Sequence, residues 1–244
     1  MLPEIAREEL TAVLETVVQE LLAEARIEGP PVDAFGLAAA LGIVVALDDR
    51  QQGRARFVRL VDARGEDSNP AILLRPDPRK ERRQWAVAHE IGEFAAWRVF
   101  DRLAVDPREM DPMVRENIAN QLATRLLLPG AWLAVDARQC AWDLARLKTL
   151  YRTASHELIA RRMLDFPSPV IITLFDQRQV SFRRSNVPGR VPGPTSGEMR
   201  VWREVHRRNR SVRSEEGMRT IRGWPVHEEH WRREILRTEL NDVE

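Results

Sequence analysis

The chain reads RRQWAVAHEIGEFAAW from Arg82 to Trp97, and the spacing of its apolar residues predicts one helix. Residues four apart share a helix face, so His89 and Glu93 would project together, with Glu90 beside them. Helices of zinc peptidases present two ligands and a general base in this way, but their pattern is H-E-x-x-H. Here Glu93 occupies the place of the second histidine, so any metal chemistry depends on what a carboxylate can do there.

A third protein ligand has to come from another segment, because His89 and Glu93 supply only two. Glu116 is the best candidate, since it opens the helical segment ENIANQLATRLLLP that ends at Pro129. The small residues Ala119 and Ala123 would let this helix pack closely on its neighbour. Gly92 supports such packing: glycine costs about 1 kcal/mol relative to alanine inside a helix, so its presence between the two candidate ligands indicates close approach of another element.

Composition and charge narrow the class of protein. The chain has 244 residues, 43% of them hydrophobic, which is enough to bury a substantial core. Its formal net charge of +1 gives no general reason to expect a nucleic-acid or membrane partner. The single cysteine, Cys140, excludes an intramolecular disulfide or a cysteine-rich zinc site and fits a reducing compartment. The first residues lack the features of a secretory signal, so we expect a cytoplasmic protein.

The order of the elements predicts an α+β fold with a small antiparallel sheet before the central helix and a β-hairpin after the helices. The predicted helices span residues 4–25, 34–41 with Asp33 as N-cap, 79–99, 112–128, one or two stretches within 132–150, and 154–164. The predicted strands span residues 43–47, 56–61, 71–74, 169–175 and 179–183.

Residues 186–197 contain three prolines and three glycines, which predicts a linker or irregular loop. We therefore expect a main domain over residues 1–185, with a helical segment at 131–165 and the hairpin at 169–184, and an Arg- and Trp-rich extension over 186–244. Trp202, Trp224 and Trp231 are too large to leave exposed, so the extension should fold back or pair with another chain. Its arginines alternate with glutamates, which is typical of an ion-paired surface and disfavours direct nucleic-acid binding.

Several motifs in this order together resemble the ImmA/IrrE family of metallo-endopeptidases. They are Pro30-Pro31-Val32-Asp33 after the opening helix, the helix from Arg82 to Gly92, the segment from Glu116 to Pro129, and the helical segment from Leu147 to Leu164. The resemblance covers about Leu21 to Arg184. It implies a zincin-like domain of the gluzincin type, in which two histidines and a glutamate bind zinc. Members of this family commonly cleave a helix-turn-helix repressor and so relieve transcriptional repression, often in stress or mobile-element control.

Carried over by position, the resemblance makes His89 the first metal ligand, Glu90 the general base and Glu116 the downstream ligand. Glu93 departs from the family pattern, and two interpretations of it stay open. As a ligand it completes a His-Glu-Glu site, which still binds Zn²⁺ but shifts the preference toward Mn²⁺ or Fe²⁺ and slows hydrolysis. As a non-ligand it marks an inactive pseudo-peptidase that acts as a protein-binding regulatory module.

Other histidines offer weaker alternatives. His156-Glu157 repeats the dipeptide of the central helix, but Ala160 stands four residues after His156, so no second ligand is offered. We expect His156 to be structural or solvent-exposed, with oxyanion stabilisation as the less favoured alternative. His227 and His230 lie three residues apart in the sequence. A less favoured alternative is that they provide the histidine ligand that is missing at position 93. A DNA-binding regulator that uses the helix from Thr153 to Leu164 is a third hypothesis, and it predicts affinity that falls steeply with salt.

Overall fold

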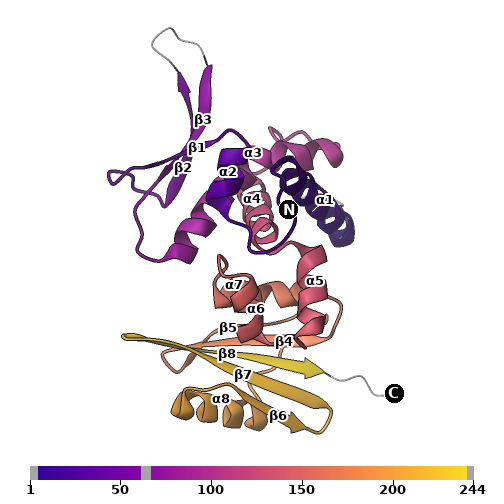
Figure 1. Cartoon of the computed structure of the whole chain (residues 1–244). Helices are drawn as coiled ribbons and strands as arrows, with labels where there is room; N and C mark the ends of the chain where they lie inside the picture. The colour runs from indigo at the N-terminus through magenta and orange to yellow at the C-terminus, as the bar shows by residue number, and fades with distance from the viewer. Residues whose placement is uncertain (1–4, 62–66, 241–244) are drawn as a thin grey trace. The chain divides into compact units, whose positions relative to one another are not determined.

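The computed structural model describes residues 5–61 and 67–240, with the backbone alone for residues 60–61 and 67–69. Residue 4 of the predicted opening helix, residues 62–66 of the predicted turn and residues 241–244 of the extension lie outside the described residues. The fold is α+β, as predicted (Figure 1). The chain divides into two compact units, one from residues 1–141 and 149–155 and the other from residues 142–148 and 156–244. The division passes through α6 (Leu144–Leu150).

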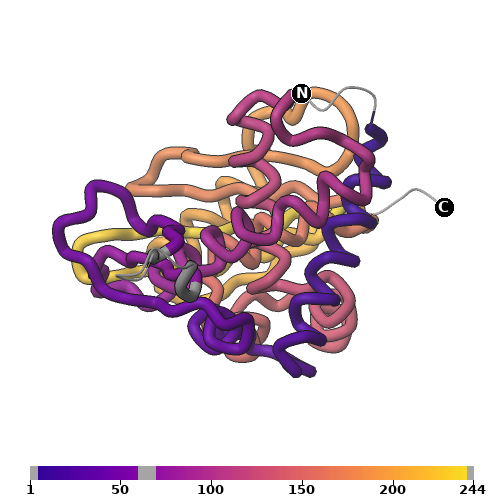
Figure 2. The backbone as a smooth tube through the Cα atoms, turned by 90° about the horizontal axis from the view of Figure 1, so that it is seen from above, coloured from indigo at the N-terminus to yellow at the C-terminus, as the bar shows by residue number. Residues whose placement is uncertain are grey.

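Helices dominate the first unit. They are α1 (Arg7–Glu24), α2 (Ala34–Ala40), α3 (Lys80–Arg102), α4 (Pro112–Leu127) and α5 (Gly130–Gln139). The predicted N-cap of α2 is confirmed, because the Asp33 side chain accepts a hydrogen bond from Phe35 N. Asp111 caps α4 in the same way and Pro112 occupies its first turn, where a missing N–H does no harm. α1 packs on both α3 and α4, and its course can be followed in Figure 2.

The sheet of the first unit has the strand order β1-β3-β2. Its strands are β1 (Val44–Leu47), β2 (Ala55–Val61) and β3 (Asp67–Leu74). β2 and β3 pair antiparallel, as predicted, and β1 joins the sheet parallel to β3, a pairing that the sequence did not assign. The reason is topological: β1 is followed by β2, which takes the far edge, and β3 returns between them in the direction of β1.

α3 and α4 approach each other closely at Gly92. A Cβ built at this position would lie 2.6 Å from the backbone oxygen of Ala119, a distance that real Cβ atoms essentially never show. Gly92 and Ala119 are both buried. The close packing expected from these small residues is therefore present, and it sets how near the side chains of α3 come to those of α4.

Replacing Gly92 by alanine should destabilise the protein by about 1–3 kcal/mol, because the new methyl group would push against helix backbone that has no rotamer to change. This loss outweighs the roughly 1 kcal/mol that alanine gains in helix propensity. Gly36→Ala is a matched control, because Gly36 also lies in a helix but its Cβ would meet only the Asp33 side chain, at 3.8 Å. Urea unfolding measures both, and a Gly92→Ala protein as stable as the wild type would show that the helices are not packed this closely.

The second unit is built on a five-stranded sheet in the order β5-β4-β8-β7-β6, with every pair antiparallel. Its strands are β4 (Val170–Asp176), β5 (Gln179–Ser185), β6 (Val212–Glu216), β7 (Arg219–Glu228) and β8 (Trp231–Leu240), and its helices are α7 (His156–Arg162), the 3-10 turn η1 (Met163–Asp165) and α8 (Ser196–Arg208). The predicted hairpin is present as β4 and β5. The extension does fold back, since β8 pairs with β4, and the predicted boundary at residues 185 and 186 falls inside this unit.

α8 covers one face of this sheet around a small core of Phe175, Val201, Val205, Ile221 and Leu236. Of the three tryptophans expected to be buried, Trp224 is buried and Trp202 packs against the core, but Trp231 is 40% exposed at the start of β8. The expectation for Trp231 was therefore wrong. Trp231 is the first residue of β8, at the turn that joins it to β7, where strand neighbours cover only part of a large ring.

A buried polar network holds the N-terminal end of α8 to the sheet. Glu198 is 1% exposed and accepts hydrogen bonds from Arg183 (3.0 and 3.1 Å), from Thr238 Oγ1 (2.6 Å) and from Thr195 N (2.8 Å). Burial acts to raise the pKa of Glu198, but these donors outweigh it and hold the pKa below its ordinary value. Glu198 therefore stays ionised and completes the capping box that begins at Thr195.

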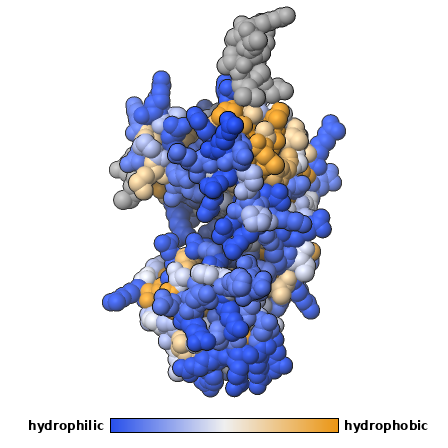
Figure 3. All heavy atoms as spheres, turned by 90° about the vertical axis from the view of Figure 1, so that its left-hand side faces the viewer, coloured by the Kyte–Doolittle hydropathy of each residue, from blue (hydrophilic) through white to orange (hydrophobic). Residues whose placement is uncertain are grey.

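Hydrophilic side chains cover most of the face shown in Figure 3. Large hydrophobic side chains exposed on the first unit include Val44 and Leu47 of β1. In the described ranges, none of the helices combines the length and the apolar character that crossing a membrane requires.

Candidate functional site

The close contact of α3 and α4 brings His89 and Glu116 face to face. His89 Nε2 lies 3.6 Å from Glu116 Oε2, and the side chains are 16% and 56% exposed. Glu116 was expected to be the distant partner of the central helix, and the two side chains do meet. Their nearness follows from Gly92 and Ala119, because a wider separation of the helices would move Glu116 out of reach of the imidazole.

Asn120 fixes the orientation of both side chains. Its Oδ1 lies 3.2 Å from His89 Nδ1, and its Nδ2 donates to Glu116 Oε1 at 3.1 Å. When Nδ1 carries the proton and donates to Asn120, the lone pair of Nε2 faces Glu116. Partners of this kind fix the tautomer and ring position of metal-binding histidines. Asn120 had no predicted role, although its position one helical turn after Glu116 was a usable signal.

Glu90 lies on the side of α3 that faces β2. Glu90 is 5% exposed, and its Oε2 accepts a hydrogen bond of 2.7 Å from Phe57 N. The Phe57 and Phe94 rings pack beside it, 5.4 Å apart. Burial raises the pKa of Glu90, and the charge of Glu93 adds to this effect, whereas His89 and the Phe57 N–H oppose it. The hydrogen bond engages one carboxylate oxygen and leaves the other to accept a proton.

These side chains border a cavity of about 260 Å³. Its lining comes from the start of β2, from α3 and from α4, namely Arg54, Ala55, Trp85, Ala86, His89, Glu90, Glu116 and Asn120. The cavity is large enough for part of an extended peptide, and its lining includes the predicted base, Glu90, and two predicted ligands, His89 and Glu116.

Glu93 completes a group of potential metal ligands. Ligand atoms of His89, Glu93 and Glu116 all lie within 4.8 Å of one another. Around a tetrahedral zinc ion the ligand atoms are roughly 3.3 Å apart, given metal–ligand bonds of about 2.0–2.1 Å, so modest rotation of the two exposed carboxylates is enough to converge on an ion. One imidazole and two carboxylates fit Zn²⁺, and the two hard oxygens also suit Mn²⁺ or Fe²⁺.

The other histidines considered from the sequence lie elsewhere. His156 opens α7 in the second unit, where the neighbouring Glu157 pairs with Arg161 and Arg233. His227 contacts Glu234 and lies 5.9 Å, ring to ring, from His206, while His230 is exposed. His227 was considered together with His230 as a possible source of a metal ligand. In the structure His227 is instead grouped with His206 and Glu234.

The chain is therefore an α+β protein with a candidate metal site between two packed helices, α3 and α4. One histidine and two glutamates form the group of potential ligands, and a third glutamate, Glu90, lies next to His89 in α3. Among solved structures, the chain is similar to a Mycobacterium tuberculosis transcriptional regulator, with a TM-score of 0.65 and 17% sequence identity, over 93% of this chain and 75% of that one. At this identity the likeness concerns the fold. No family model matches the chain, and a search of curated proteins gives no match.

Proposed function

We propose that the chain is a metal-dependent endopeptidase of the ImmA/IrrE type, with His89, Glu93 and Glu116 as metal ligands and Glu90 as general base. The observation that carries the proposal is that ligand atoms of these three residues lie within 4.8 Å of one another. Two of the three, His89 and Glu116, line a cavity that Glu90 also lines. A bound divalent cation supplies Lewis-acid polarisation of the scissile carbonyl and makes the attacking water more acidic.

Proton transfer and the positioning of the ligands are the roles of residues in the chain itself. Glu90 takes the proton of the attacking water and returns it to the leaving amine. Asn120 holds the His89 ring and the Glu116 carboxylate in place through the two hydrogen bonds described above. These roles need no movement of the helices, because the positions are fixed by the Gly92 contact.

The substrate that this arrangement suits is an extended segment of a protein. β2 is an edge strand of the described sheet, and Ala55 at its start lines the cavity. An edge strand presents N–H and C=O groups that an extended peptide can pair with. The resemblance to the ImmA/IrrE family makes a helix-turn-helix repressor the expected protein substrate, and the transcriptional role named for the structural neighbour agrees with this.

The test uses a library of peptides from a proteome digest, incubated with the chain loaded with Zn²⁺ or Mn²⁺ and read by mass spectrometry. We expect new peptide termini that depend on the metal and disappear with a chelator. A chain that binds metal but releases no new termini from the library or from folded repressor proteins is not an endopeptidase.

A second candidate is a pseudo-peptidase that acts as a regulatory binding module. The observation in its favour is Glu93, an exposed carboxylate in the place of the second histidine. Two anionic ligands weaken an ion as a Lewis acid, which lowers the expected rate of hydrolysis. In this case the chain would bind its protein partner without cleaving it.

Glu93→His tests whether position 93 contacts the metal. We expect it to tighten zinc binding and to speed peptide cleavage, because a neutral imidazole replaces an anionic ligand and leaves more positive charge on the ion. Asp101→His is the control, because it places a histidine at an exposed position on the same helix, away from the ligands. Isothermal titration gives the affinity and the peptide library gives the rate. Equal effects of the two variants would mean that position 93 does not contact the metal.

A further inference from the structure

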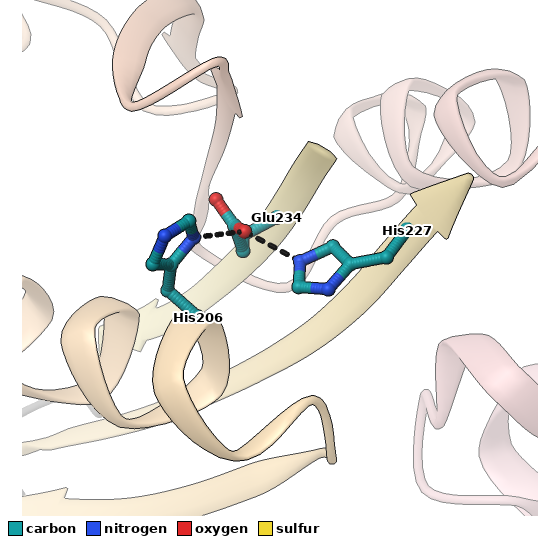
Figure 4. A group of neighbouring side chains, drawn as sticks. All are labelled: His206, His227 and Glu234. Carbon is teal, nitrogen blue, oxygen red and sulfur yellow. Dashed lines mark hydrogen bonds and ion pairs between the residues drawn. The ribbon is translucent and has the colours of Figure 1, made fainter. Parts of the chain in front are cut away.

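The second unit contains another group of histidine and carboxylate side chains, His206, His227 and Glu234 (Figure 4). Glu234 Oε1 lies 2.7 Å from His206 Nδ1 and 2.6 Å from His227 Nε2. Figure 4 shows the two rings pointing at the same oxygen, one from α8 and the other from β7, with the carboxylate on β8. Potential ligand atoms of all three residues lie within 4.8 Å of one another.

Sheet register explains why these residues meet. Pro225 pairs with Glu234 across β7 and β8, and His227 follows Pro225 by two residues, so the side chains of His227 and Glu234 stand on the same face. α8 lies close to this face because Gly223 has no side chain: a Cβ there would lie 2.7 Å from Val205 Cγ2. His206 follows Val205 in α8 and so reaches Glu234.

A further contact orients the carboxylate. Trp202 Nε1 donates to Glu234 Oε2 at 2.9 Å, and the Trp202 ring stacks on His206 with centroids 5.6 Å apart. The indole therefore holds one carboxylate oxygen and turns the other toward the two imidazoles. Metal-binding carboxylates commonly have such an outer partner, whose loss weakens metal affinity.

Burial and charge favour a cation here. Glu234 is 0% exposed, and in the described part of the chain its side chain contacts the indole of Trp202 and the two histidines, groups that carry no fixed charge. A fully buried carboxylate needs a compensating positive charge or a metal ion. The imidazoles are 16% and 11% exposed, which leaves a route for an ion from solvent.

We propose that His206, His227 and Glu234 form a second metal site that takes a divalent cation of the zinc class. Two imidazole nitrogens and one carboxylate oxygen suit Zn²⁺, and the short contacts need to open to roughly 3.3 Å to surround it. The ion would join α8 to β7 and β8 and so stabilise the second unit. The site does not depend on the proposed peptidase centre, because the two groups share no residue.

The test is zinc titration of the full chain in the His89→Ala background, in which the first centre lacks its histidine. We expect one zinc ion per chain by calorimetry and by metal analysis after dialysis, and a Tm that rises with zinc concentration. His227→Gln and Glu234→Gln, each added to this background, keep hydrogen-bonding groups of similar shape but remove a ligand, and they should abolish the binding. His230→Ala is the matched control, since it removes an exposed histidine of the same unit and should change nothing.

Trp202→Phe tests the outer contact, because phenylalanine keeps the ring and loses the N–H. It should weaken zinc binding by about 10- to 100-fold while leaving the stoichiometry at one. Far-UV circular dichroism establishes that each variant is folded. A folded His89→Ala chain that binds no zinc, or that binds it equally well after His227→Gln and Glu234→Gln, would overturn the proposal and leave the cluster as a hydrogen-bonded network.

Discussion

Glu90→Gln is expected to lower peptide cleavage by about two to four orders of magnitude and to leave zinc binding unchanged. A decrease in rate of this size is expected when a general base is lost, because glutamine cannot take a proton from water. The fold should be kept, because the glutamine oxygen can still accept the hydrogen bond from Phe57 N that Glu90 accepts now. Initial rates on a peptide identified from the library, with the metal content of both proteins measured in parallel, give the result.

Glu109→Gln is the control for this loss, because Glu109 is exposed and lies in the loop before α4. It should cleave at the wild-type rate. A Glu90→Gln protein that keeps full activity would show that another group takes the proton, even if the metal centre is correct.

The largest effect on stability is expected from Glu198→Ala, at about 3–5 kcal/mol. Removing one partner of a buried ion pair leaves the other charged and unpaired, here Arg183, which is 8% exposed. The substitution also removes half of the capping box of α8. Glu204→Ala is the matched control on the same helix, because its pair with Arg208 is solvent-exposed and should contribute less than about 1 kcal/mol.

This contribution should also depend on pH. The pKa of Glu198 is lower in the folded protein than in the unfolded chain, so its stabilising effect is complete above the unfolded value of about 4.3 and is lost as the pH falls through the folded value. The difference in unfolding free energy between the wild type and Glu198→Gln should therefore shrink below roughly pH 4.3. A difference that stays constant down to acid unfolding would contradict the assigned ionisation.

Most residues of the candidate site in the first unit could be predicted from local spacing in the sequence. His89, Glu90 and Glu93 lie within one turn and a half of a helix, so their periodicity alone placed them together. Gly92 indicated the close approach of a neighbouring helix, and Glu116 lies near the start of that helix, α4. Asn120 was missed because its contact with His89 depends on how the two helices pack, which the spacing within one helix does not show.

The second unit was harder to predict because its sheet pairs strands that are far apart in the sequence, such as β4 and β8. His206, His227 and Glu234 come from three elements and meet only through the register of β7 and β8. β7 contains Gly223 and Pro225, residues that normally argue against a strand, but Pro225 lies beyond the end of β6 and so needs no N–H on that side. The start of α8 was predictable, since Thr195 and Glu198 form a capping-box pattern.

The most direct test of the metal centre is zinc titration of the His227→Gln chain, in which the second site has lost a ligand and the first is intact. We predict one zinc ion per chain, and none once Glu116→Gln is added. Glu116 is exposed, so this second change should not affect folding. A folded His227→Gln chain that binds neither zinc nor manganese would contradict the proposed centre of His89, Glu93 and Glu116, and with it the peptidase function.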